Sequence, residues 1–311
     1  MKRLFSILLS IAILCTLTSS AFAADAVTDS TDDIAVAAFS PEFPDAYLEY
    51  GGPAPALQSS SVPSESPLGT ITVTAFCAEA YNPETGEVLY SRLMNKEEVA
   101  DWRAAGSPTE PTLTSASSDA AVETRGELKL TLAVYPYADG GVSEYNTNLV
   151  ARGQADWLKG PSWGAGVTRP SWGRDIIGIS WTKGLDAFNR EATATSNNGD
   201  DVDISLCEWD DTEFVSWEFI EQFGPHIGSI GGPDWAESIE CSTGLGVPPS
   251  VYYQKADIAL TYAHSYSDVV IDDVSVSVGV SKDGPEAGLD ISFGAEANEW
   301  TIIAIVDGVD L

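Results

Sequence analysis

The chain has 311 residues, of which 47 are acidic, 15 are Lys or Arg and two are His, so its formal charge at pH 7 is −32. A surface this acidic repels nucleic acid and anionic lipid at long range, which argues against a nucleic-acid partner. The four cysteines include no C-x-x-C pair and no Cys/His spacing typical of structural zinc, so a zinc-stabilised module is not expected.

Residues 1–23 have the composition of an export signal. Lys2 and Arg3 precede an apolar run over 4–17, and the A-F-A sequence at 21–23 matches the pattern at which signal peptides are cleaved. Removal of this segment takes away two basic residues and predicts a secreted, extracellular protein with a formal charge of −34. No later stretch has about 18 uninterrupted apolar residues, so we expect no membrane insertion after cleavage.

The segment 24–68 is rich in Ala, Ser, Pro and Asp and has no sustained apolar period. Such a composition does not bury enough apolar surface to offset the entropy lost when the chain becomes ordered. We therefore expect a disordered arm between the export signal and the first ordered unit.

A small ordered unit is predicted over 69–106. Apolar residues alternate with threonines from Ile71 to Cys77, and the turn sequence N-P-E-T-G follows at 82–86, which together predict a β-hairpin. A hairpin with one short helix buries little area, so we expect this unit to lean on the larger domain or on a partner.

The helix of this unit has a clear start signal. Asn95 is a suitable N-cap with Glu98 three residues later, as in a capping box. Met94 and Val99 occupy the two positions of a hydrophobic staple. The next segment, 107–126, consists mainly of Ser, Thr, Pro and Ala with few large apolar residues, which predicts a solvated linker.

Strand signals dominate the remaining domain, 127–311. Apolar and polar residues alternate over 128–134 and 149–157, and Val alternates with Ser or Gly over 274–280. About ten strands fit, and no long amphipathic helix is present. The predicted fold is therefore all-β, an antiparallel β-sandwich with jelly-roll topology possible and a closed barrel as the alternative.

Charge is distributed unevenly within this domain. The stretch 152–190 has six basic and three acidic residues, whereas 191–254 has thirteen acidic residues and neither Lys nor Arg. One interpretation is that the two stretches pair within the chain. Another is that the basic stretch of one copy contacts the acidic stretch of a second copy, which predicts a self-associating structural protein.

The sequence P-S-W-G occurs twice in the basic stretch, nine residues apart, and places Trp163 and Trp172 in equivalent loop settings beside Arg169 and Arg174. Trp faces suit sugar rings, and Arg forks suit carboxylates. These four residues are the predicted ligand site, for a glycan or another cell-envelope component. The alternative is that both Trp side chains cover one end of the sandwich core.

Asp200, Asp201 and Asp203, with Asn197 and Asn198, provide hard oxygen ligands in a short turn, as Ca²⁺ prefers. The spacing does not match an EF-hand loop, and the Asn-Gly pair in the same turn is also a strong hairpin signal. We expect no cofactor, with calcium at these three Asp residues as the alternative.

Export leaves three cysteines in an oxidising environment, where one disulfide can form. We predict that Cys207 pairs with Cys241, because both belong to the 127–311 domain while Cys77 lies beyond the predicted linker.

The Gly/Pro-rich segment 223–250 is interpreted as a long loop, and long loops in compact domains are often functional. It contains His226, Ser229 and Asp234, the residue types of a hydrolytic triad, but it misses the G-x-S-x-G elbow by one position. An extracellular hydrolase is therefore an alternative. The leading hypothesis is a secreted, non-enzymatic binding or surface-interaction protein, because no motif in the chain specifies a reaction.

Overall fold

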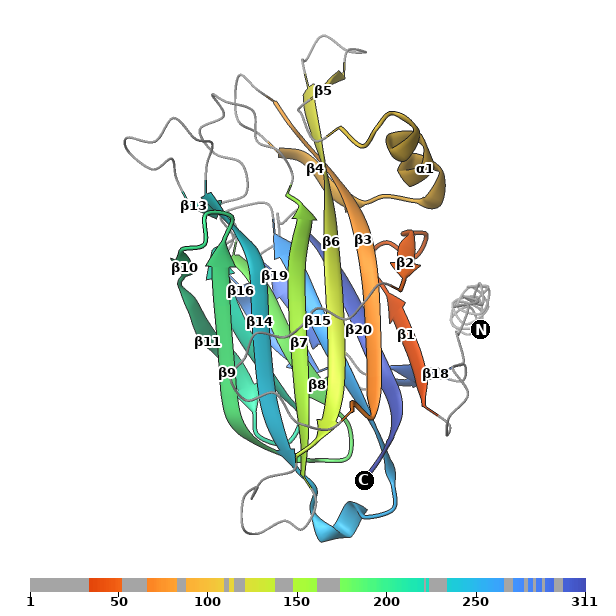
Figure 1. The fold of residues 1–311 in the computed structure, drawn as a ribbon, viewed down its shortest axis with the longest axis vertical. Helices are drawn as coiled ribbons and strands as arrows, with labels where there is room; N and C mark the ends of the chain where they lie inside the picture. Colours follow the sequence, from red (N-terminus) through yellow and green to blue (C-terminus); the bar gives the residue numbers. More distant parts are fainter. Residues whose placement is uncertain are drawn as a thin grey trace, which may run out of the picture.

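The computed structural model describes residues 34–51, 66–82, 88–108, 112–114, 121–137, 148–160, 174–220, 222–223, 234–265, 271–276, 279–281, 284–286, 289–293 and 299–311. Over these residues the protein is all-β, and two antiparallel sheets pack face to face, the larger in front of the smaller in Figure 1. The predicted β-sandwich class is confirmed. Among the described residues the one α-helix is α1 (Lys96–Ala104), and a short 3₁₀ turn, η1, covers Pro249–Val251.

The smaller main sheet has six strands. In spatial order they are β1 (Ala35–Phe39), β20 (Glu299–Asp310), β15 (Lys255–Ser265), β8 (Arg174–Trp181), β12 (Phe214–Ile220) and β11 (Ile204–Asp210). All the neighbouring strands run antiparallel.

The larger sheet has ten strands. Seven of them follow the order β10 (Asp201–Val202), β9 (Asp186–Ser196), β14 (Asp234–Gly246), β7 (Asn148–Lys159), β6 (Ala121–Pro136), β3 (Gly69–Tyr81) and β2 (Leu48–Tyr50). The other three pair off this path: β13 (Gln222–Phe223) with β14, β4 (Val88–Leu93) with β3, and β5 (Thr112–Thr114) with β6. Two small hairpin-like pairs complete the strands, β16 (Ile271–Val276) with β19 (Leu289–Phe293) and β17 (Gly279–Ser281) with β18 (Gly284–Glu286).

The core lies between the two main sheets and is built by period-2 alternation. In β6, the alternate residues from Leu128 to Val134 are buried and face the core, as the sequence pattern predicts. The two layers approach closely at Gly153, where a Cβ atom would lie 2.3 Å from Leu260 Cδ1 and 2.9 Å from Cys241 Sγ. A side chain at this position of β7 would therefore force the sheets apart.

The capping prediction for α1 is confirmed. Asn95 Oδ1 accepts hydrogen bonds from the backbone N–H groups of Glu97 and Glu98, each at 3.0 Å, and Glu98 Oε2 accepts from the Asn95 N–H at 2.9 Å. The helix buries Val99 and Trp102 in a small cluster with Phe76 of β3, so it covers one end of the larger sheet (Figure 1). The helix thus packs on β3 of its own hairpin, which is part of the larger sheet.

The structure does not divide at residue 127, where the sequence predicts the start of the larger domain. β3 pairs with β6 through thirteen residue pairs, from Gly69–Val134 to Tyr81–Val122. The predicted 69–106 unit therefore contributes an internal strand to the larger sheet, and the predicted 107–126 linker includes β5 and the start of β6. Periodicity in a sequence shows that a strand forms but not which distant strand it pairs with, and this is why the boundary was misplaced.

The predicted disordered arm and the predicted 223–250 loop also contain strands. β1 pairs with β20 and β2 pairs with β3, so part of 24–68 adds an edge strand to each sheet. β14 lies inside 223–250 and pairs with β7 on one side and β9 on the other. Its small and polar residues have low strand propensity. The pairing of β14 with β7 on one side and β9 on the other outweighs this low propensity.

Candidate functional site

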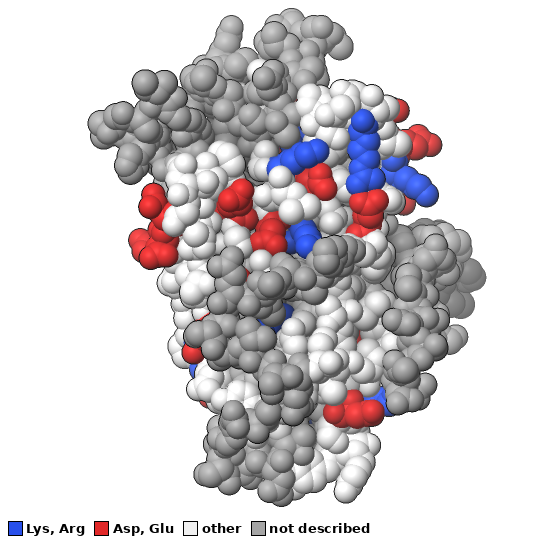
Figure 2. Space-filling model, viewed as in Figure 1, with Lys and Arg blue, Asp and Glu red and all other residues white. Residues whose placement is uncertain are grey.

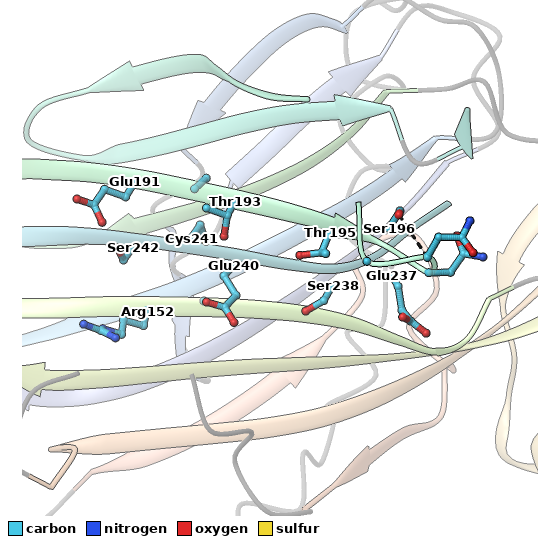
Figure 3. A pocket seen from close by; sticks show the side chains of 15 residues that line it. Arg152, Glu191, Thr193, Thr195, Ser196, Glu237, Ser238, Glu240, Cys241 and Ser242 are labelled. Carbon is cyan, nitrogen blue, oxygen red and sulfur yellow. Dashed lines mark hydrogen bonds between the residues drawn. The ribbon is translucent and has the colours of Figure 1, made fainter. Parts of the chain in front are cut away.

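A groove of about 790 Å³ lies on the face of the larger sheet that points away from the core. It runs over β7, β14 and β9 and reaches the turn that follows β9. The 15 lining residues are Arg152, Gly153, Glu191, Ala192, Thr193, Thr195, Ser196, Asn197, Asn198, Gly199, Glu237, Ser238, Glu240, Cys241 and Ser242. Figure 3 shows the labelled side chains spread along the strands, with Arg152 and Glu191 at one end of the groove and Glu237 at the other.

Strand register explains why these side chains share one surface. Thr193 lies opposite Glu240, Thr195 opposite Ser238 and Glu191 opposite Ser242. Alternate residues of a strand face the same side, so β9 contributes Glu191, Thr193 and Thr195 to one row. Thr195 lies four residue steps along the strand from Glu191, which gives the row a length of about 14 Å.

The groove lining is polar and carries excess negative charge. Its side chains include five hydroxyl groups, two amides, three carboxylates and one guanidinium. Carboxylates, amides and hydroxyls accept or donate hydrogen bonds, and the lining includes no aromatic side chain. The surface suits a ligand with many hydroxyl groups that is neutral or cationic, because an anionic ligand would meet three glutamates.

Arg152 provides the one cationic group of the lining. It is 5% exposed, and its guanidinium carbon lies 6.0 Å from the centre of the Tyr135 ring. Farther along β7, Asp156 accepts hydrogen bonds from the Ser238 hydroxyl at 2.6 Å and from the Gln154 amide at 2.9 Å. These bonds fix the Ser238 side chain at the groove wall.

The far end of the groove adjoins one end of the sandwich. Asn197, which lines the groove, donates its N–H to the Trp235 carbonyl at 3.0 Å, and its side chain accepts the Trp235 N–H at 3.0 Å. The Trp235 ring in turn lies against Gly160, the residue before segment 161–173, because a Cβ at Gly160 would be 3.1 Å from Trp235 Nε1. Within the described residues this indole N–H has no hydrogen-bond partner.

Three of the four predicted ligand residues, Trp163, Arg169 and Trp172, lie outside the described residues. The fourth, Arg174, begins β8 and forms an ion pair with Glu218 of β12. The hypothesis of a contact face formed by these four residues therefore remains a prediction.

The basic and acidic stretches contact each other within one chain. Arg174 pairs with Glu218, and Arg190 pairs with Asp211. Each pair joins a basic residue of 152–190 to an acidic residue of 191–254. This agrees with the intrachain interpretation and leaves fewer charges for self-association. In Figure 2 most of the basic side chains on the visible face lie in its upper right part among acidic ones, and acidic side chains lie at its upper left edge.

The segment of the calcium hypothesis forms a hairpin turn between β9 and β10. Gly199 has a φ of +83°, and Ser196 closes the turn by accepting the Gly199 N–H at 2.8 Å and donating its own N–H to the Asp200 carbonyl at 2.8 Å. Asp200, Asp201 and Asp203 are all exposed. No three acidic, His or Cys side chains among the described residues converge as a metal site would need, and calcium binding here stays a prediction.

The predicted disulfide between Cys207 and Cys241 is absent, and both residues are thiols. Cys207 lies on edge strand β11 of the smaller sheet, whereas Cys241 is buried in β14 of the larger sheet. Burial raises the pKa of Cys207 to about 11, with Glu218 and Glu208 adding to the shift, and burial also raises the pKa of Cys241. Both thiols therefore stay protonated and unreactive near neutral pH.

The three candidate residues of the hydrolase alternative cannot be compared as a triad within the described part of the chain. His226 and Ser229 lie outside the residues that the structure describes, and Asp234 is the first residue of β14. Of the described helices, none is long and apolar enough to cross a bilayer.

No protein-family model and no curated protein matches this chain. Among solved structures, one resemblance is to the major pilin SpaA of Corynebacterium diphtheriae, with 10% identity over 76% of this chain and 79% of that one, and a TM-score of 0.23. Another is to the N-terminal domain of the Streptococcus gordonii adhesin Sgo0707, with 9% identity over 92% of this chain and 83% of that one, and a TM-score of 0.17. Likenesses this weak carry no argument about function.

Proposed function

We propose that this protein is a secreted, non-enzymatic binding protein that holds a glycan of a cell envelope in the groove over β7, β14 and β9. The observation that carries the proposal is the polar groove itself, with hydroxyl, amide and carboxylate groups in register along about 14 Å of sheet. These groups match the hydrogen-bonding pattern of sugar hydroxyls. The export signal predicted at 1–23 supports a location outside the cell.

The neighbourhood of the groove supports a wider contact surface. Its Asn197 end borders Trp235 and Gly160, and segment 161–173 follows Gly160 in the sequence. We propose that Trp163 and Trp172 of that segment add the aromatic faces that the groove lining lacks. A glycan in the groove would then receive hydrogen bonds from the sheet and stacking from the two Trp side chains.

The test is a glycan array followed by sedimentation with insoluble cellulose, chitin and peptidoglycan. We expect the wild-type mature protein to bind a neutral or amino-sugar polymer, and the double variant Glu240→Gln/Thr193→Val to bind about tenfold or more weakly, because each lost hydrogen bond to a charged group contributes about 1.5–3 kcal/mol. Both side chains line the groove and neither is buried, so the variant should fold.

Glu213→Gln is the matched control, because it removes one exposed carboxylate in the turn before β12, outside the groove. It should bind as the wild type does. If the groove variant bound as tightly as the wild type, the groove would not be the binding site. If the wild type bound none of the polymers, the proposal that the ligand is a glycan would be refuted. A loss of binding in Trp163→Ala/Trp172→Ala would add the Trp segment to the site.

A further inference from the structure

A cluster of ionisable side chains is completely buried between the two sheets. Glu79 of β3, Asp175 of β8 and His264 of β15 each have 0% exposure. Glu79 belongs to the larger sheet, and the other two belong to the smaller sheet. Ionisable groups are costly to bury unless they are paired, so this cluster needs an explanation.

Each ring nitrogen of His264 faces a carboxyl group. Nε2 lies 2.7 Å from Glu79 Oε1, and Nδ1 lies 3.1 Å from Asp175 Oδ2. Asp175 also accepts the Tyr262 hydroxyl at 2.5 Å and the Ser265 N–H at 3.1 Å. Because Asp175 already accepts these two hydrogen bonds, we assign it the acceptor role toward Nδ1 as well, so that the histidine carries the Nδ1 proton.

The aromatic surroundings keep water out and add hydrogen bonds between the sheets. Trp157 of the larger sheet donates its indole N–H to the Tyr262 hydroxyl at 3.3 Å. Trp300 of the smaller sheet donates to the Ser91 hydroxyl at 3.1 Å, and Ser91 donates to Glu79 Oε1 at 3.4 Å. The His264 ring centre lies 4.8 Å from that of Trp300 and 6.0 Å from that of Trp157.

The contact between His264 Nε2 and Glu79 Oε1 requires a proton. A neutral imidazole has one N–H, and the carboxylate of Asp175 takes it at Nδ1. If Glu79 were ionised beside a neutral ring, two lone pairs would face each other at 2.7 Å between two side chains with no solvent exposure. Either the ring is an imidazolium or Glu79 is a carboxylic acid that donates to Nε2. Both states hold one proton more than a neutral histidine with two carboxylates.

We propose that the folded protein retains this additional proton between Glu79 and His264, and that the proton ties the two sheets together as a pH-dependent lock. Among the described residues, the titratable groups that face the cluster include Glu79 from the larger sheet and Asp175 and Tyr262 from the smaller one. Within the described residues, Glu79 Oε2 has no hydrogen-bond partner, so the contact to His264 is the main polar anchor of that side chain.

The sign of the pH dependence follows from proton linkage. In the unfolded chain a histidine loses its proton near pH 6.5, whereas the folded cluster keeps it. Above that pH the folded state binds one more proton than the unfolded state, so the unfolding equilibrium constant rises about tenfold per pH unit until the folded cluster releases the proton. Below about pH 6.5 this stabilisation is fully present.

Nuclear magnetic resonance of ¹⁵N-histidine-labelled protein tests the proton directly. The chain has two histidines, so the spectrum contains His264 and a single internal reference, His226. We expect the His264 ring to show no titration between pH 5.5 and 8, with Nε2 bonded to a proton or accepting one in a hydrogen bond from Glu79. A His264 ring with one N–H and an Nε2 that accepts no hydrogen bond, or a ring that titrates near pH 6.5, would overturn the proposal.

Urea unfolding of Glu79→Gln tests the consequence. A glutamine amide donates a hydrogen bond to Nε2 of a neutral ring without an additional proton. Provided that Glu79→Gln folds, its unfolding equilibrium constant should therefore not rise tenfold per pH unit above about pH 6.5. In the surface variant Glu213→Gln, the unfolding equilibrium constant should rise with pH as it does in the wild type. A constant ratio between the unfolding constants of wild type and Glu79→Gln from pH 6.5 to 8.5 would contradict the lock. If Glu79→Gln does not fold, the wild-type spectrum alone decides.

Discussion

The half-buried carboxyl of Glu299 lies at the start of β20, beside Glu42. Burial, and then the charge of Glu42, raises its pKa to about 7 from the ordinary 4.5. Glu42 accepts the Thr301 N–H at 3.1 Å and the Ser40 hydroxyl at 3.2 Å, and these two bonds hold its side chain at the start of β20. The two side chains join the N-terminal segment to the last strand.

A raised carboxyl pKa means that the folded state binds the proton more tightly than the unfolded state. The contribution of Glu299 to stability is therefore present below about pH 4.5 and is lost as the pH rises to about 7. Glu299→Gln keeps the neutral form at every pH, so we expect urea unfolding to show a smaller fall in stability between pH 4.5 and 7 than in the wild type. An unchanged pH profile in the variant would contradict the assignment.

Site prediction from the sequence was weakest at the scale of residues. The groove side chains come from strands that are far apart in the chain, such as Thr193 and Glu240, and only their register brings them together. The E-A-T-A-T pattern at 191–195 signals polar residues on one face, but it does not say which strand lies next to it. The His264 cluster likewise joins residues 185 positions apart, Glu79 and His264.

At the scale of elements, α1 shows how far local signals reach. The N-cap, the N3 glutamate and the two staple residues all lie within six residues, so this short stretch contains the whole start signal of the helix. The strands with strict alternation, such as β6 and β7, were predicted for the same reason. β14 was missed because its polar and small residues break the apolar pattern, and it forms through its two neighbours.

The capping box gives a prediction for this element. Asn95→Ala removes the side chain that accepts two backbone N–H groups, and we expect a loss of about 1 kcal/mol in the free energy of unfolding. Asn95→Asp retains an acceptor at the same place and should restore most of the stability. Urea unfolding followed by circular dichroism measures both variants. Equal stability of Asn95→Ala and the wild type would show that the cap is not important for stability.

At the scale of the whole molecule, the two sheets share one core that includes strands from both ends of the described chain. β1 and β2 lie at the N-terminal end, and β20 lies at the C-terminal end. Leu132 of β6, Ile71 of β3 and Ile302 of β20 belong to the same buried cluster. The proposed His264 lock depends on this arrangement, because β3 must be part of the same body as β15.

Hydrogen exchange followed by mass spectrometry tests this single body most directly. We expect the backbone amides of β3 (Gly69–Tyr81) to be protected as strongly as those of β7 and β15, and to become exposed together with them as urea is added. If residues 69–106 instead exchanged at low urea while 127–311 stayed protected, they would form a separate unit, and the shared core would be contradicted.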